Sequence, residues 1–172
     1  MIKNILINIE KNCERWLLLI FYILIVTTIG IEVLRRFGLS YSSIWGEEIA
    51  RYAFIYLVWV GTAAAVKDRA HLRIDVLMQF MSPRGKAFTY IFGDVVMLGV
   101  AVLALYFSFE TLQVSLKFGS VTHGLRISQA WFLAAVPIGF VLVCTRLIQS
   151  IWRDVSDLRS GRPVFEGYRL FD

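Results

Sequence analysis

The chain has 172 residues, of which 58% are hydrophobic and 18% are charged, and its formal net charge is +5. Average soluble proteins are about half apolar and about a quarter charged, so this composition excludes an ordinary soluble domain. The positive charge follows the membrane topology predicted below and does not indicate a nucleic-acid-binding protein.

The apolar residues are concentrated in four long runs with few interior charges. A bilayer core about 30 Å thick is crossed by about 20 helical residues, which is the length of these runs. The runs do not alternate with a period of two, which argues against transmembrane strands. We therefore predict an all-α membrane protein, a single domain over residues 1–172, with transmembrane helices at 16–35, 45–66, 86–110 and 128–150.

The first fifteen residues permit two interpretations. Ile2, Ile5, Ile9 and Cys13 recur at helical spacing between polar residues, which is typical of an amphipathic helix in the membrane interface. The alternative is a cytoplasmic extension of the first transmembrane helix. That helix has too long an apolar run for a signal peptide and no small-residue cleavage pattern after it, so we expect an uncleaved anchor.

A second amphipathic segment, residues 69–81, follows the second transmembrane helix. Leu72, Val76 and Phe80 share one helical face, and His71 and Asp75 share the other. We therefore predict a second interfacial or partner-binding helix there, before a proline that stops the pattern.

The fourth helix is expected to continue past the membrane, because its apolar stripe extends to Leu158. Gly161 and Pro163 are expected to end it, and residues 160–172 form the tail.

Lysine and arginine residues gather on one side of the predicted spans. Thirteen lie in the N-terminal segment, the 67–86 connection and the C-terminal segment, against four on the other side, or five with Arg51. The positive-inside rule therefore predicts that both termini are cytoplasmic. Cys13 and Cys144 fall at cytoplasmic ends of helices, where a disulfide is not expected.

The sequence offers little for catalysis. His71 and His123 lie in connections on opposite sides of the membrane, which excludes a haem held by two histidines of this chain. No phosphate-binding glycine loop and no Cys/His cluster with metal-ligand spacing occurs, so we expect neither an enzyme nor a metal site. Paired glycine or proline breaks of a transport path are also lacking, since Pro137 is the one proline inside a predicted span.

Two acidic residues, Glu32 and Asp94, fall inside predicted spans. An ionisable residue at the centre of the bilayer costs about 2.5–3.5 kcal/mol on insertion scales, so each needs an explanation. We expect ordinary ion pairs, Glu32 with Arg35 or Arg36 and Asp94 with a basic partner from elsewhere in the chain.

The second helix begins with three charges, Glu47, Glu48 and Arg51, after a candidate N-cap, Ser43. Arg51 is spaced to pair with either acid on one helical face. One acid is left over, and we expect it to bind an arginine of the first helix or a partner protein. The candidate rim and docking residues are Arg35, Arg36, Trp45, Glu47, Glu48 and Arg51.

The stretch WGEEIARYAFIYLVWVGTAAAVKDRAHLRIDVL, residues 45–77, resembles the signature of the small membrane subunit of TRAP transporters, the tripartite ATP-independent periplasmic carriers. The preceding VLRRFG and the later RISQAWFLAAVPIGFVLVCTRLI are also similar to that family. The matching residues in the long stretch are Trp45, Glu47, Glu48, Ala50, Gly61, Ala63, His71 and Asp75.

The resemblance implies a scaffold subunit without catalysis or cofactor in the bacterial inner membrane. Its partners would be membrane phospholipid, a large membrane subunit of about a dozen helices and a periplasmic binding protein. The large subunit would carry the Na⁺ and substrate sites and move like an elevator, importing sialic acid, a C4-dicarboxylate or another organic acid. The candidate contacts to the large subunit or the cytoplasmic interface are Gly61, Trp59, His71, Asp75 and Arg146.

Two other classes of protein stay open from the residues alone. One is the membrane anchor of a redox complex, and the other is a small oligomeric channel. A haem absorption band would favour the first, and ion leak from vesicles holding this chain alone would favour the second.

Overall fold

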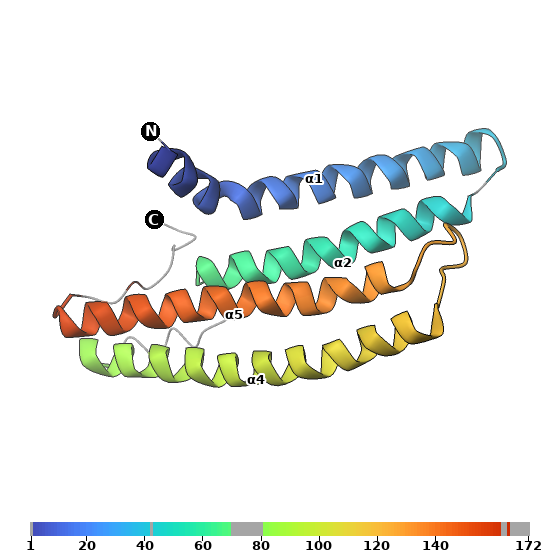
Figure 1. Ribbon diagram of the computed structural model, residues 1–172. Helices are drawn as coiled ribbons and strands as arrows, with labels where there is room; N and C mark the ends of the chain where they lie inside the picture. The colour runs from blue at the N-terminus through green and yellow to red at the C-terminus, as the bar shows by residue number, and fades with distance from the viewer. Residues whose placement is uncertain (1, 42, 70–80, 163–164, 166–172) are drawn as a thin grey trace.

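The computed structural model describes residues 2–41, 43–69, 81–162 and 165. Within these ranges the chain forms four helices and no strand, which confirms the all-α prediction. They are α1 (Ile2–Gly38), α2 (Ile44–Lys67), α4 (Pro83–Phe118) and α5 (Ala130–Arg159) (Figure 1). Each contains a span long and apolar enough to cross a membrane, as predicted.

The helices lie side by side in a single row, in the order α1, α2, α5, α4 (Figure 1). An outer helix of a row has one neighbour, so α1 and α4 leave most of their apolar surface uncovered by this chain. In the most apolar window of α1 no residue is buried, against 28% of the corresponding windows of α2 and α5. Surface of this kind requires lipid or another protein around it.

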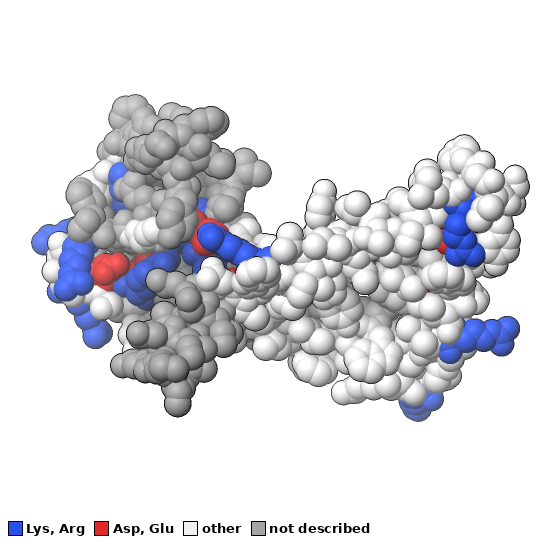
Figure 2. All heavy atoms as spheres, turned by 90° about the horizontal axis from the view of Figure 1, so that it is seen from above, with Lys and Arg blue, Asp and Glu red and all other residues white. Residues whose placement is uncertain are grey.

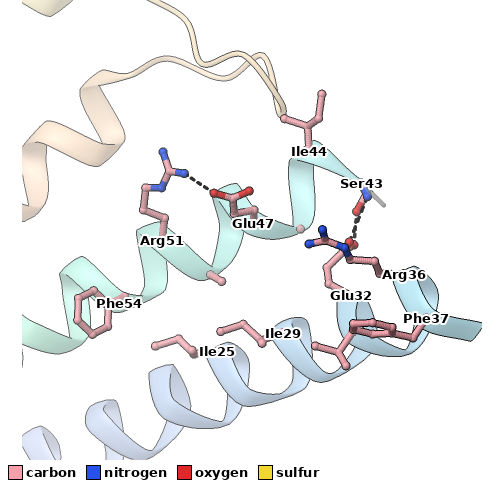
Figure 3. Close-up of a pocket in the computed structure, with 13 residues that line it drawn as sticks. Ile25, Ile29, Glu32, Arg36, Phe37, Ser43, Ile44, Glu47, Arg51 and Phe54 are labelled. Atoms are coloured by element: carbon pink, nitrogen blue, oxygen red, sulfur yellow. Dashed lines mark hydrogen bonds and ion pairs between the residues drawn. The ribbon is translucent and has the colours of Figure 1, made fainter. Parts of the chain in front are cut away.

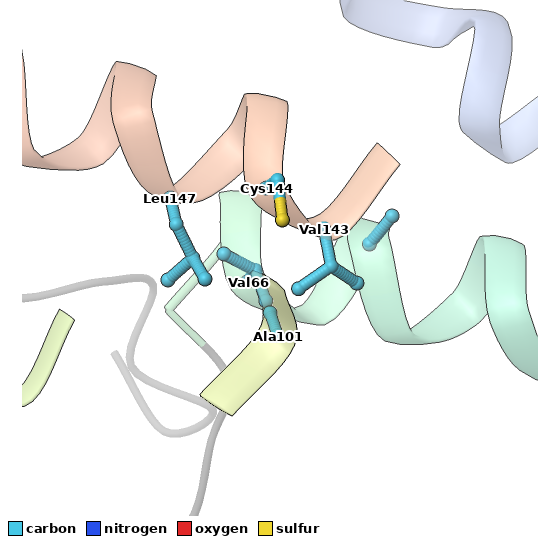
Figure 4. Close-up of a cluster of buried hydrophobic side chains, with 6 residues drawn as sticks. Val66, Ala101, Val143, Cys144 and Leu147 are labelled. Carbon is cyan, nitrogen blue, oxygen red and sulfur yellow. The ribbon is translucent and has the colours of Figure 1, made fainter. Parts of the chain in front are cut away.

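The core lies around α5, between α2 on one side and α4 on the other (Figure 4). Its buried side chains form one cluster, to which α2 contributes Ala63 and Val66, α4 contributes Ala101, and α5 contributes Val143, Cys144 and Leu147. These side chains are mostly small, which allows helix backbones to approach closely where lipid supplies no hydrophobic driving force.

The N-terminal residues belong to α1, which is a single helix from Ile2 to Gly38 and agrees with the extension interpretation. Figure 1 shows its first turns at an angle to the rest. The predicted helix at 69–81, with His71 and Asp75, falls almost wholly outside the described residues and stays a prediction.

Two helix ends differ in how well they were predicted. The prediction that α4 stops near residue 110 is wrong, because the helix continues to Phe118. Residues 110–118 contain no glycine or proline, and Gly119, with a left-handed φ of 60°, caps the helix. In α5 the predicted end is confirmed, since the helix stops at Arg159 and Gly161 has a φ of 66°.

Candidate functional site

Charged side chains gather at the two ends of the molecule and leave an apolar belt between them (Figure 2). We call the end formed by connections 38–44 and 119–129 the loop end. We call the end formed by residues 12–15, 67–69, 150–162 and 165 the terminal end. A belt between two charged ends is the pattern of a protein that spans a bilayer.

At the loop end, Glu32 of α1 holds the start of α2. Its carboxylate accepts a hydrogen bond from the Ser43 backbone N–H at 3.1 Å and another from the Ser43 hydroxyl. Arg35 Nη1 lies 3.4 Å from the same carboxylate, which confirms the predicted pairing of Glu32 with one of the two arginines. Ser43 precedes α2 as expected, but its side chain makes no capping bond and serves Glu32 instead. The predicted N-cap position is therefore confirmed, although the side-chain capping hydrogen bond does not form.

Arg35 is enclosed by aromatic rings as well as by Glu32. Its guanidinium lies 4.8 Å from the ring centroid of Tyr41 and 5.4 Å from that of Trp45. Cation–π contacts of this kind add to the ion pair. Arg35 and Trp45, both predicted rim residues, thus fix the turn between α1 and α2.

The two acids at the start of α2 have different roles. Glu47 pairs with Arg51 at 2.7 Å, and both side chains are exposed. Glu48 instead turns to the 119–129 connection, where its Oε2 accepts a hydrogen bond from the Leu125 backbone N–H at 2.7 Å. A Cβ added to Gly124 would lie only 2.5 Å from that oxygen, so the loop closes tightly on the carboxylate. The acid that the sequence left over is bound by backbone within this chain, and not by Arg35 or Arg36.

Arg36 is exposed and has no hydrogen bond or ion pair to any residue in the described ranges. It lies beside an open groove of about 550 Å³ between α1 and α2 (Figure 3). The charge without a partner in the described residues at this groove is therefore the cation Arg36. The sequence analysis had instead left an acid at the start of α2 without a partner.

At the terminal end, Arg69 is the centre of a buried network. Its guanidinium forms an ion pair with Asp154 of α5, in which the two side chains are 1% and 0% exposed. It also donates to Ser150 Oγ at 3.1 Å and to the Phe165 carbonyl at 2.6 Å. These contacts join the end of α2 to α5 and to the C-terminal segment.

Asp94 of α4 enters the same network, as the sequence predicted for an acid with a basic partner. Its carboxylate accepts a hydrogen bond from Ser150 at 2.7 Å and lies 3.8 Å from Arg69. Tyr90, one turn earlier, places its ring 5.0 Å from the Arg69 guanidinium. The intramembrane acid is thus structural, and its cation, Arg69, lies two residues after the end of α2.

A second network joins α1 to α2 and α5. Glu14, with an 8% exposed side chain, accepts bonds from Lys67 Nζ at 2.9 Å and Arg146 Nε at 2.6 Å. One carboxylate between two cations locks the start of the α1 span to its neighbours. Arg146 was predicted as an interface residue, and in the structure its Nε donates to Glu14 and its Nη1 to Gln149 of the same chain.

The sequence profile of the family described as tripartite ATP-independent periplasmic transporters, DctQ component, matches residues 23–157. The chain belongs to this family. It is therefore a small permease subunit of a TRAP transporter and a multi-pass membrane protein.

Relatives of this small permease subunit include a protein of similar length and proteins several times longer. It is 25% identical to the sialic acid TRAP transporter small permease protein SiaQ of Vibrio cholerae, over 88% of this chain and 84% of that protein. It is 24% identical to the isethionate TRAP transporter permease protein DctMQ of Oleidesulfovibrio alaskensis, over 83% of this chain. It is 29% identical to the sialic acid TRAP transporter permease protein SiaT of Haemophilus influenzae, over 81% of this chain. Those matches span only 24% and 22% of the two longer relatives.

Two predicted interface residues of the small permease subunit lie against its own helices. A Cβ added to Gly139 of α5 would meet the Trp59 ring at 2.6 Å, and the Phe140 ring centroid is 4.6 Å from that of Trp59. Gly61 faces α1, with Leu18 3.6 Å from an added Cβ. Contacts of Trp59, Gly61 and Arg146 with the large subunit stay predictions.

Sequence reasoning missed Glu14, Arg69 and Asp154 of the small permease subunit. For Asp154 a signal existed, since Val143, Leu147, Ser150 and Asp154 recur every three or four residues on one buried face of α5. An acid on such a stripe must find a cation inside the fold. For Arg69 no signal existed, because its direction depends on a left-handed backbone, with a φ of 53°.

Proposed function

We propose that this small permease subunit is the fixed, non-catalytic scaffold of a sodium-coupled importer of an organic anion. In this proposal both termini are cytoplasmic, so the loop end faces the periplasm of a bacterium. The relatives named for isethionate, sialic acid and a C4-dicarboxylate support an anionic organic substrate without selecting one.

The observation that carries the proposal is the single row of helices. A substrate path needs polar groups around an enclosed site, usually at interrupted helices near mid-membrane. A row one helix deep encloses no such path, and the described intramembrane acids are engaged within the chain. The uncovered apolar surfaces of α1 and α4 support packing against a larger membrane subunit. We therefore assign substrate and Na⁺ binding, and the elevator movement, to that large subunit.

The loop end is the proposed docking face for the periplasmic binding protein. Glu48 fixes the 119–129 connection by its bond to Leu125, and this presents the exposed His123 on an ordered surface. The exposed pair of Glu47 and Arg51 lies beside it. An ordered, charged rim favours recognition of a soluble partner, because little surface has to be ordered when it docks.

Reconstituted uptake tests the proposal. We expect vesicles holding this chain, its large subunit and its binding protein to take up a labelled organic anion when a Na⁺ gradient is imposed. Vesicles holding this chain alone should show neither uptake nor ion leak. Ion leak from this chain alone would favour the small channel, and a haem absorption band in the purified complex would favour the redox anchor. Uptake that persists without the small subunit would contradict the scaffold role.

A further inference from the structure

The groove between α1 and α2 at the loop end changes in character along its length (Figure 3). Toward the middle of the span its walls are Ile25, Ile29 and Phe54. Toward the loop end they carry two acids and two arginines, namely Glu32, Glu47, Arg36 and Arg51. Its volume of about 550 Å³ lies in the range of about 300–1,000 Å³ that is common for small-molecule sites. The groove is therefore apolar where a bilayer is apolar and charged where the headgroups begin.

When the charged residues described at the groove are paired, one cation has no acidic partner among them. Glu32 is engaged by Ser43 and Arg35, and Glu47 is engaged by Arg51. Arg36 has no ion pair or hydrogen bond to the described part of the chain. An anionic group above the apolar walls would supply the missing partner.

The apolar walls are uncovered in this chain. Ile29 is 49% exposed and Phe54 is 56% exposed, although both line the groove. A hydrocarbon chain covers such walls without leaving polar backbone unsatisfied. An apolar helix of a partner would cover them too, but it would leave Arg36 without an anion.

We propose that this groove binds one phospholipid molecule. Its phosphate accepts hydrogen bonds from the Arg36 guanidinium, and Arg51 lies beside the phosphate. A planar guanidinium can bind two phosphate oxygens at once, in a bidentate contact. One acyl chain lies along Ile25, Ile29 and Phe54. The occupant is thus a structural lipid held between two helices of the small subunit, and this goes beyond the proposed scaffold function. The orientation proposed above decides only which leaflet supplies it.

Native mass spectrometry of the complex with the large subunit, purified in mild detergent, tests the proposal. We expect one retained phospholipid per small subunit in the unmodified complex. Arg36→Gln should lower the retained fraction about tenfold, which equals about 1.4 kcal/mol and is within reach of one hydrogen bond to a charged group. Ile29→Trp should lower it as well, because the larger ring fills the groove. Lys117→Gln removes an exposed cation at the same end outside the groove and should leave retention unchanged.

A photo-cross-linking residue in place of Phe54 identifies the occupant directly in membranes holding the full complex. We expect an adduct with the mass of a phospholipid, weakened by Arg36→Gln. Capture of the large subunit in place of lipid would overturn the proposal, since a polypeptide would then fill the groove. Equal lipid retention in Arg36→Gln, Ile29→Trp and the unmodified chain would overturn it too, because the retained lipid would then lie elsewhere.

Discussion

The buried pair between Arg69 and Asp154 yields the most direct test of how the terminal end is held together. Replacing Asp154 with alanine removes the carboxylate and leaves the Arg69 guanidinium buried, with its side chain 1% exposed. Breaking one side of a buried pair costs about 3–5 kcal/mol. Arg69 would keep the Phe165 carbonyl at 2.6 Å and Asp94 at 3.8 Å, so we expect the lower value, about 3 kcal/mol.

The assay is thermal unfolding of the purified chain in mild detergent, followed by far-ultraviolet circular dichroism. For a chain of this length, 1 kcal/mol shifts the midpoint by about 2–4 °C, so Asp154→Ala should lower it by about 6–12 °C. The matched control is Glu47→Ala, which also removes one acid from an arginine pair. That pair is 76% and 62% exposed, and exposed helical pairs contribute about 0.3–0.5 kcal/mol, so its midpoint should move by about 1–2 °C.

A double variant separates charge from packing at this site. Arg69→Met with Asp154→Leu removes both buried charges and keeps apolar volume, which is often neutral for a buried pair. We expect it to recover part of the loss, because Asp94 then lacks its cation but keeps the Ser150 hydroxyl. Equal midpoints for Asp154→Ala and Glu47→Ala would refute the reasoning, since burial would then make no difference.

Three further predictions concern single contacts. Glu48→Gln should weaken the bond to Leu125 by about 1 kcal/mol and speed hydrogen exchange of that amide about fivefold; an unchanged rate would show that the carboxylate does not hold the loop. Gly139→Ala should cost about 1–3 kcal/mol of stability by overpacking against the Trp59 ring, and Trp59→Leu should relieve it; no rescue in the thermal midpoint would count against that contact. Glu14→Gln leaves two cations around a neutral amide, so the thermal midpoint should fall by about 4–8 °C for a loss of about 2 kcal/mol, and a wild-type midpoint would contradict the lock on α1.

Ion pairs between residues one helical turn apart could be predicted from their spacing alone. Glu32 lies one turn before Arg35 and Glu47 one turn before Arg51, and both pairs form as helical geometry requires. The hydrogen-bond partner of Glu48 could not be predicted from the sequence, because Leu125 lies far along the chain and donates only its backbone N–H. A backbone donor leaves no mark in the residue pattern, so the spare acid looked unpaired.

The sequence by itself determined the four membrane spans and the family, because apolar runs of bilayer length and a long local motif need no knowledge of packing. Only the tertiary structure decided the order of the helices in the row, the burial of Asp154 against Arg69, and the cation left over at Arg36. The physical reason is that apolar helices in lipid have no sequence-encoded preference for one apolar neighbour over another. Their partners are selected by small-residue contacts and long-range ion pairs, which exist only after the helices have been placed side by side.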